Sequence, residues 1–288
     1  MMEEKKEEKD YAIRPEVVNY DDVSRWVPAL RGHRKLVNSI LKFLSIDKVN
    51  GVHARHCDTP GIPFSQALVD EEFKLKLRVD NMEVLERFRD GGAFITVSNH
   101  PFGALDGIVL LELLGSVRPD FKVMVNMFLN HITAMRPNFI AVDPSASNDP
   151  EKRRTTMQGI REAMTRVRQG HPIGFFPAGA VSRLHGDLRI YDREWQPSII
   201  RLIQQLGVPV VPIFFHGHNS TFFNLLGVIS WRIRTLRLPA EVFRRKGKSM
   251  HISVGEPIMP EEQKSCSGLE EFGRLLRDKT YILRDIYK

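Results

Sequence analysis

The feature that most constrains the fold is a regular alternation of short apolar runs with helical stretches between residues 93 and 254. The apolar runs are rich in β-branched and aromatic residues, which predicts buried strands. The expected strands are Ala93–Val97, Phe121–Val125, Phe139–Val142, Ile173–Phe176, Val208–Phe215 and His251–Val254. The expected helices are Gly107–Leu114, Arg153–Arg168 and Ser198–Leu206. Because strands that alternate with helices pair side by side, we predict an α/β fold with a mostly parallel sheet flanked by helices.

The first 90 residues are expected to form an N-terminal tail and helical region, ahead of an α/β domain over residues 91–288. Residues 1–9 are a mixed-charge stretch that predicts a solvated tail. In residues 34–44 apolar residues recur at helical spacing beside Arg and Lys, so a basic amphipathic helix is expected. This helix either packs on the main domain or contacts a membrane surface.

Two segments join this helix to the first strand. Residues 51–63 contain several Gly and Pro residues with two His and one Cys, which predicts a loop. Solvated histidines are favoured there over a metal site, because the ligand spacing fits no familiar template. Residues 71–88 show a helical pattern that Gly91 and Gly92 would end.

The charge balance and the cysteines narrow the function classes. A net charge of +7 and a pI near 9.5 favour an anionic partner, such as nucleic acid, an anionic bilayer surface or a phosphorylated carrier. Cys57 and Cys266 form neither a disulfide framework nor a CxxC signature, which favours a reducing cytoplasm. No run approaches the roughly 18 consecutive apolar residues of a membrane span, and residues 1–10 are charged rather than an apolar signal segment.

Chemistry is expected where the strand at residues 93–97 ends. The sequence SNHPFGALDG places His100 after this strand and Asp106 near the start of a helix. Sites in parallel sheets gather at the carboxyl ends of strands. An imidazole near a carboxylate is a general-base arrangement, because the carboxylate orients the ring and stabilises its protonated form. The alternative is that Asp106 only caps a helix and His100 takes no part in catalysis.

Two further strand ends carry polar or Pro-containing sequences. In residues 173–183 a strand ends in Pro and Gly and is followed by Ser182 and Arg183. Backbone N–H groups and a guanidinium at such a place would meet an anionic group; the alternative is an ordinary strand exit with an exposed Arg. Residues 208–213 predict a buried strand bracketed by prolines.

Taken in order, these stretches resemble the PlsC-type glycerolipid acyltransferase family, whose blocks are NHxxxxD, a second block with a phosphate-binding Arg, FPEGTRS and VPVxPV. The corresponding stretches are Asn99–Asp106, Pro137–Asp143, Phe176–Arg183 and Val208–Ile213. The resemblance covers roughly residues 91–257. It implies the glycerolipid acyltransferase fold and a catalytic pair formed by His100 and Asp106.

Three positions depart from the family pattern. Five residues rather than four separate His100 from Asp106, Pro144 stands about where the second-block Arg would be, and Ala178 replaces the Glu of FPEG. The wording NHPFGALDG and FPAGAVSR is more similar to the hemolysin-like branch, which includes enzymes that O-acylate lyso-forms of ornithine and glycine lipids. Those acceptors carry an amino-acid headgroup instead of a phosphate, which would explain the loss of the Arg.

The resemblance implies an O-acyltransferase that moves a fatty acyl group from acyl carrier protein or coenzyme A to a lyso-lipid hydroxyl. The acceptor would be an amino-acid lyso-lipid, such as lyso-ornithine or lyso-glycine lipid, or a lysophospholipid. His100 would deprotonate the hydroxyl, Asp106 would orient His100, and no covalent acyl-enzyme would form. The expected substrate-binding residues are Asn99, Phe102, Gly103, Pro177, Gly179, Ser182 and Arg183. Gly179 is a candidate for the oxyanion or pantetheine contact, and Arg183 for an anionic headgroup or carrier phosphate.

The same resemblance implies no metal and no cofactor beyond the acyl donor. The expected partners are the acyl carrier protein or coenzyme A thioester, the lyso-lipid and an anionic membrane surface, so the protein is expected on the cytoplasmic face of the membrane as a peripheral protein. Nucleic acid is not an expected partner, because no basic strand face with interleaved aromatic residues is evident. A non-catalytic lipid- or acyl-carrier-binding protein of the same fold is the alternative, motivated by Ala178 and the missing Arg.

Three features near the C-terminal half leave two interpretations each. His216 and His218 are either loop histidines or metal ligands, and loop histidines are favoured. Residues 221–231 are either core or an interfacial acyl-chain site. The densest basic region is either a solvated surface or a contact for anionic headgroups or an acidic acyl carrier protein. It comprises Arg232, Arg234, Arg237, Arg244, Arg245, Lys246 and Lys248.

Overall fold

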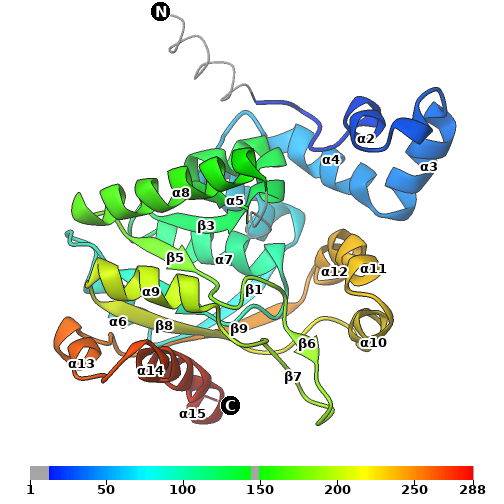
Figure 1. Ribbon diagram of the computed structural model, residues 1–288. Helices are drawn as coiled ribbons and strands as arrows, with labels where there is room; N and C mark the ends of the chain where they lie inside the picture. Colours follow the sequence, from blue (N-terminus) through cyan, green and yellow to red (C-terminus); the bar gives the residue numbers. More distant parts are fainter. Residues whose placement is uncertain (1–12, 144–148, 288) are drawn as a thin grey trace, which may run out of the picture.

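A seven-stranded sheet forms the centre of the computed structural model, which describes residues 13–143 and 149–287 (Figure 1). The strand order is β1-β9-β8-β2-β5-β3-β4, and all neighbours are parallel except the antiparallel pair β8 and β9. The strands are β1 (Lys76–Asp80), β2 (Ile95–Ser98), β3 (Lys122–Asn126), β4 (Phe139–Val142), β5 (Ile173–Phe175), β8 (Val210–Phe215) and β9 (Ser249–Val254). The expected α/β fold with a mostly parallel sheet is therefore confirmed.

A separate antiparallel hairpin pairs β6 (Arg183–Leu184) with β7 (Ile190–Tyr191). The helices of the N-terminal half are α2 (Tyr20–Trp26), α3 (Arg34–Phe43), α4 (Ile46–His56), α5 (Ile62–Ala67), α6 (Met82–Glu86) and α7 (Ala104–Gly115). The later helices are α8 (Pro150–Arg168), α9 (Pro197–Leu206), α10 (Thr221–Ile229), α11 (Trp231–Leu236), α12 (Leu238–Arg244), α13 (Pro260–Lys264), α14 (Leu269–Tyr281) and α15 (Leu283–Ile286). Short 3₁₀ segments are η1 (Pro28–Leu30), η3 (Met127–His131) and η4 (Thr133–Asn138).

The sheet separates two apolar cores. Helix α7 packs on one face, where its leucines meet alternate β8 side chains such as Val211 and Ile213. Helices α8, α9 and α14 cover the other face (Figure 1). Ile95 of β2 and Val210 of β8 belong to the core on that side. This division follows from the alternation of side chains along a strand. Helix α7 is buried on nearly every side, which suits its almost entirely apolar sequence.

Two N-terminal expectations are wrong. Residues 71–88 do not form a helix: a π-helical turn, η2 (Leu68–Glu72), precedes strand β1 and helix α6. The alternate residues Leu77 and Val79 are half-buried, and β1 pairs with β9. Partners 173 residues away, such as Ser249 for Lys76, therefore outweigh the local helical pattern. Strand β1 thus belongs to the sheet although it precedes residue 91.

The expected loop at residues 51–63 is also wrong, because α4 continues to His56 and α5 begins at Ile62. The side chain of His53 is buried, and its ring nitrogens contact the backbone oxygen of Pro15 at 3.0 Å and the backbone nitrogen of Ala134 at 3.2 Å. These contacts hold a helical face against the domain. The expected tail at residues 1–9, together with Pro144, lies outside the described residues.

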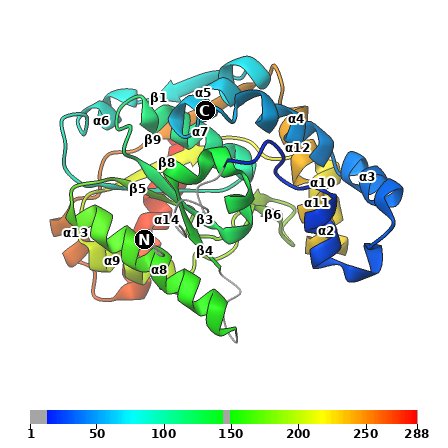
Figure 2. The same ribbon diagram turned by 90° about the horizontal axis from the view of Figure 1, so that it is seen from above.

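Helices α2, α3 and α10–α12 lie on the same side of the molecule in both views (Figures 1 and 2). Helix α3 buries Val37, whereas Leu36, Ile40 and Phe43 are exposed. Among the helices of residues 13–143 and 149–287, none combines the length and the apolar character that crossing a bilayer requires.

Candidate active site

His100 stands just beyond the carboxyl end of β2, in the middle of the sheet. The preceding residue, Asn99, extends the pairing of β2 with β8. Its Nδ2 donates to the backbone oxygen of Phe215 at 2.9 Å, and its Oδ1 accepts from the backbone nitrogen of Phe215 at 2.7 Å. Asn99 is buried. It therefore fixes the strand end that carries His100. The oxygen and the nitrogen of its side-chain amide both bond to the protein rather than face a ligand.

The structure brings His100 and Asp106 together. Nδ1 of His100 lies 3.0 Å from Oδ2 of Asp106, whose side chain is fully buried. The same Oδ2 accepts hydrogen bonds from the backbone nitrogens of Phe102 at 2.8 Å and Gly103 at 3.0 Å. Helix α7 begins at Ala104, three residues before the expected start, so Asp106 sits in its first turn. The carboxylate can then fold back over the turn that contains the additional residue.

Gly103 makes this turn possible. Its φ of +76° lies in the left-handed region that favours glycine, and a Cβ there would stand 3.0 Å from a Leu238 methyl group and 3.1 Å from one of Val181. Helix α7 also directs its N-terminus toward the carboxylate, where a negative charge is favourable.

Burial raises the pKa of the Asp106 carboxyl above its ordinary value, while the contact with His100 and the N–H groups of Phe102 and Gly103 oppose this rise. The His100 ring packs against Phe176, with 4.3 Å between ring centroids. The guanidinium of Arg245 lies over the Phe102 ring at 4.5 Å and attracts the Asp106 charge, although burial lowers the pKa of Arg245 itself. The pair thus sits in a largely dehydrated pocket with one cation nearby.

A second carboxylate, Asp192, joins the His100 turn to the loop after β5. Oδ1 of Asp192 accepts from the backbone nitrogen of His100 at 3.1 Å and from Oγ of Ser182 at 2.5 Å. Oδ2 accepts from the indole nitrogen of Trp195 at 3.3 Å. The backbone nitrogen of Ser182 also donates to the carbonyl oxygen of His100 at 2.9 Å. Sequence reasoning missed Asp192, because a single Asp 92 positions after His100 carries no local signal.

The loop after β5 is packed tightly around Gly179. Gly179 has a φ of +63°, and a Cβ there would stand 1.9 Å from Nε2 of Gln196. The carbonyl oxygen of the buried Ala178 accepts from Arg193 Nε at 2.7 Å and from Gln196 Nε2 at 3.3 Å. These contacts hold the backbone of Gly179 beside His100, and its positive φ favours glycine at this position.

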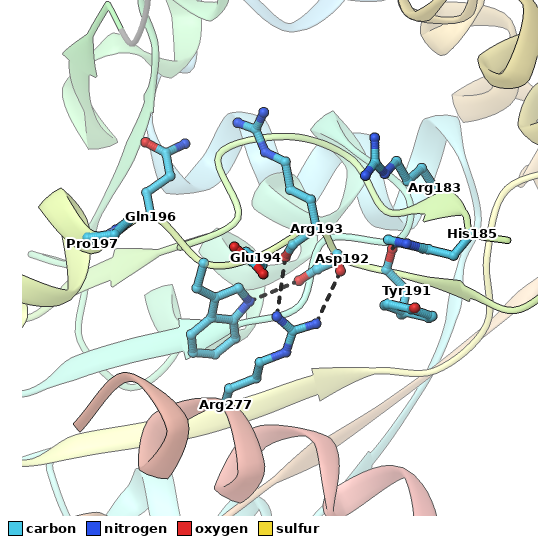
Figure 3. Close-up of a pocket in the computed structure, with 10 residues that line it drawn as sticks. Arg183, His185, Tyr191, Asp192, Arg193, Glu194, Gln196, Pro197 and Arg277 are labelled. Atoms are coloured by element: carbon cyan, nitrogen blue, oxygen red, sulfur yellow. Dashed lines mark hydrogen bonds between the residues drawn. The ribbon is translucent and has the colours of Figure 1, made fainter. Parts of the chain in front are cut away.

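Two cavities adjoin this loop. A cavity of about 120 Å³ lies directly at His100 and has mainly apolar walls from residues such as Ile108, Leu129, Ile132 and Phe176. Gly103 and Gly179 line this cavity as well. A more open cavity of about 820 Å³ lies beside the β6–β7 hairpin and contains Arg183, Arg193 and Arg277 (Figure 3). His100 thus lines the smaller cavity, and the three arginines line the larger one.

The larger cavity is built on the backbone around Asp192. Arg277 of α14 donates to the carbonyl oxygens of Asp192 at 3.2 Å and Arg193 at 3.5 Å (Figure 3). His185 and Tyr191 stack with 3.7 Å between ring centroids. Arg183 is exposed, and no hydrogen bond or ion pair engages its guanidinium within the described part of the chain. Its charge is therefore available to a ligand.

The expected substrate-binding residues fall into two groups. Gly103 and Gly179 line the His100 cavity, and Arg183 lines the larger one. The other four residues are buried inside the protein and line neither cavity: they are Asn99, Phe102, Pro177 and Ser182. Local sequence does not separate these groups, because burial depends on segments that pack from elsewhere in the chain.

His216 belongs to a different cluster, on the other face of the sheet. Ligand atoms of Asp80, His216 and His251 lie within 4.8 Å of one another, a spacing that could hold a metal ion. The two imidazoles, however, stack at 3.9 Å with 10° between their planes. Parallel rings direct their lone pairs side by side instead of toward one ion. Their nitrogens instead contact Ser253 at 2.8 Å and Asp80 at 2.5 Å, respectively.

A family model described as Acyltransferase matches residues 64–288. The chain is 28% identical over 230 residues to the lyso-glycine lipid O-acyltransferase of Bacteroides thetaiotaomicron, across 77% of this chain and 80% of that protein. It is also 28% identical over 230 residues to the protein of the same name from Phocaeicola vulgatus, across 77% and 78% of the two chains.

A solved structure is also similar to this chain. It is the crystal structure of the 1-acyl-sn-glycerophosphate acyltransferase PlsC from Thermotoga maritima, with 15% sequence identity and a TM-score of 0.47. The similarity covers 74% of this chain and 73% of the other.

Proposed function

The chain belongs to the acyltransferase family, and from this premise we propose that it moves a fatty acyl group from a thioester of acyl carrier protein or coenzyme A to the hydroxyl of a lyso-lipid. An amino-acid lyso-lipid, such as lyso-glycine or lyso-ornithine lipid, is the favoured acceptor. Both similar curated proteins are named lyso-glycine lipid O-acyltransferases. The sequence also has Pro144 where a phosphate-binding Arg would be expected, which disfavours a lysophospholipid.

One observation carries this proposal: Nδ1 of His100 lies 3.0 Å from the fully buried Asp106 carboxylate. The carboxylate favours a proton on Nδ1, which leaves Nε2 of His100 as the base. Nε2 would take the proton of the acceptor hydroxyl as its oxygen attacks the thioester carbonyl. A new C–O bond forms, the C–S bond breaks, and the thiolate leaves with the proton that His100 held.

The two cavities suit the two ends of the donor. The apolar walls beside His100 fit the part of the acyl chain next to the thioester, because apolar side chains favour hydrocarbon over water. The backbone N–H of Gly179 is our candidate for stabilising the oxyanion. Arg183 in the larger cavity is our candidate for the phosphate of the carrier arm. Because the proposed acceptor is a membrane lipid, the enzyme would work as a peripheral protein, at the cytoplasmic face where we expect its donors.

The test is acyl transfer by the purified chain from acyl carrier protein and coenzyme A donors to lyso-glycine lipid, lyso-ornithine lipid and a lysophospholipid. Replacing His100 by Ala removes the general base, so kcat should fall by about 10²–10⁴-fold with little change in KM. Asp106→Asn should lower kcat by about 10²-fold or more, because it leaves the imidazolium without its counter-charge. His33→Ala, at an exposed histidine outside the site, is the matched control.

Equal turnover by His100→Ala and the parent would contradict the general-base mechanism. If the parent transfers acyl groups to none of the acceptors but binds lipid or acyl carrier protein, the non-catalytic alternative is favoured. Ala178 motivates that alternative, because it stands where the family pattern has Glu.

A further inference from the structure

Helices α10 and α11 turn their apolar side chains toward solvent. Seven large apolar side chains between residues 222 and 236 are each at least 48% exposed. They are Phe222, Leu225, Val228, Ile229, Trp231, Ile233 and Leu236. We call these seven side chains the α10–α11 face. The interpretation of residues 221–231 as core is therefore wrong for most of them, although Phe223 is buried.

The inner side of the same helices is mostly polar. The guanidinium of the buried Arg234 donates to the carbonyl oxygens of Ser182 at 3.1 Å and Val181 at 3.3 Å. Gly227 leaves room for it, since a Cβ there would stand 2.6 Å from Cδ of Arg234. The buried Asn224 donates to the carbonyl oxygen of Asn219 at 3.0 Å. Polar groups inside and apolar groups outside are the reverse of what an amphipathic helix presents to water.

These contacts also fix the α10–α11 face relative to the active site. Val181 and Ser182 belong to the loop after β5, and Ser182 is joined to the His100 turn through Asp192. At the start of α10, the backbone nitrogen and Oγ of Ser220 donate to the carboxylate of the buried Glu241, at 2.9 and 2.8 Å. The face is thus held on a rigid support that is continuous with the catalytic loop.

Basic residues lie beside the α10–α11 face. No Asp or Glu occurs between Glu194 and Glu241, and residues 221–248 contain seven Arg and Lys against one buried Glu. The guanidinium of Arg232 lies 5.5 Å from the Trp231 ring centroid, and that of Arg237 lies 5.9 Å from the Phe222 ring centroid. An apolar surface with a cationic border is complementary to the edge of an anionic bilayer, where phosphates lie above hydrocarbon.

We propose that the α10–α11 face docks on an anionic lipid bilayer, with its apolar side chains among the acyl chains and Arg232 and Arg237 at the headgroup phosphates. The inference rests on the proposed function only in that the acceptor is a lipid. Docking would bring the loop after β5, and through it His100, to the surface from which a lyso-lipid enters. Helix α3, whose side chains Leu36, Ile40 and Phe43 are exposed, lies on the same side of the molecule (Figures 1 and 2).

The test is sedimentation of the full chain, without acyl donor, with vesicles of phosphatidylcholine alone or mixed with phosphatidylglycerol. The parent should bind the mixed vesicles, and salt should weaken this binding. Ile229→Asp combined with Ile233→Asp should weaken it by about tenfold or more, because both side chains would bring charges into the acyl region. Arg232→Glu should weaken binding to the mixed vesicles by about fivefold or more.

Matched controls lie on α8, away from this face. Met157→Asp and Arg154→Glu alter an equally exposed apolar and an exposed basic residue, and both should bind vesicles like the parent. All variants should keep the melting temperature of the parent, since each changes exposed side chains. Equal vesicle binding by the parent and the double Ile variant would overturn the proposal, as would a parent that binds no vesicle.

Other occupants of the face would give different results. If the double Ile variant splits a dimer in gel filtration but keeps vesicle binding, the face belongs to a second copy of the chain and the proposal is overturned. If the double Ile variant loses binding to acyl carrier protein but keeps vesicle binding, the proposal is overturned as well. A parent that binds vesicles but transfers no acyl group contradicts the proposed function alone. A parent that transfers acyl groups, with variants of the α10–α11 face that bind vesicles as well as it does, contradicts only this inference.

Discussion

At the scale of single residues, the candidate site depends on two buried carboxylates with different tasks. Asp106 faces the His100 ring, whereas Asp192 accepts hydrogen bonds from the backbone nitrogen of His100 and the hydroxyl of Ser182. Asp192 touches no reacting atom, so we regard it as a positioning residue that fixes the turn on which the base stands. Geometry held by such groups determines how often the base and the acceptor hydroxyl are aligned.

Replacing Asp192 by Ala should lower kcat by about ten- to a hundredfold and change KM for the donor much less, because the turn loses its alignment whereas Arg183 stays in the wall of the larger cavity. Asp192→Asn retains one acceptor oxygen and should restore part of kcat. Ser182→Ala, which removes a single hydrogen bond, is the milder comparison. Steady-state kinetics with a fixed acceptor checks this order. A fall in melting temperature with kcat unchanged in Asp192→Ala would assign Asp192 a purely structural role.

At the scale of secondary-structure elements, β5 is the point where the two cores and the site meet. Gly174 lies in the middle of β5, between β2 and β3. A Cβ at Gly174 would stand 2.7 Å from the Phe121 ring, 2.9 Å from Oγ1 of Thr96 and 3.2 Å from a Leu110 methyl group. The absence of a side chain lets α7 pack closely on the sheet, which aligns the start of α7 with the end of β2.

Gly174→Ala should therefore lower the free energy of unfolding by about 1–3 kcal/mol, because an added methyl group in a filled core forces its neighbours apart. Urea denaturation followed by circular dichroism measures the change, with the m-value expected to stay constant. Gly186→Ala is the control: it has nothing within 4 Å of the added methyl group, and its effect should stay within about 0.5 kcal/mol. Similar unfolding midpoints for the two variants would refute the packing argument.

At the scale of the whole molecule, the cluster around His216 couples stability to pH. It joins β8, β9 and β1, which lie far apart in the sequence. Burial, with the neighbouring His251 charge, lowers the pKa of His216 from 6.5 to about 4. Asp80 and Arg78 are the other charged groups that act on it, and they oppose each other. Folding therefore keeps this imidazole neutral over a range in which the unfolded chain would protonate it.

Because the unfolded chain binds this proton from about pH 6.5 downward and the folded protein does not, the free energy of unfolding should fall as the pH decreases from 6.5 to about 4. Above pH 6.5 the contribution of His216 to the free energy of unfolding should be fully present. His216→Gln should remove about 1–2 kcal/mol of this decrease, after allowance for solvent screening. Urea titrations at several pH values test it, with His33→Gln as the exposed control. Parallel curves for His216→Gln and the parent would exclude the effect.

The α/β fold, the central strands and the position of His100 and Asp106 at a strand end could all be predicted from the sequence. These features follow from local periodicity, turn residues and the order of the motifs, all of which are written in contiguous stretches. The boundaries were less certain: α7 begins three residues early, because Asp106 and Gly103 together shape its first turn.

The contacts between residues far apart in the chain could not be predicted in this way. Asp192 accepts a hydrogen bond from His100, 92 positions earlier, and β1 is a strand because it pairs with β9. On α11 the buried side chain is Arg234, whereas the apolar side chains face solvent. The physical reason is the same in each case: burial and hydrogen bonding are set by long-range packing, and a local pattern of apolar residues does not state which face a neighbour will cover.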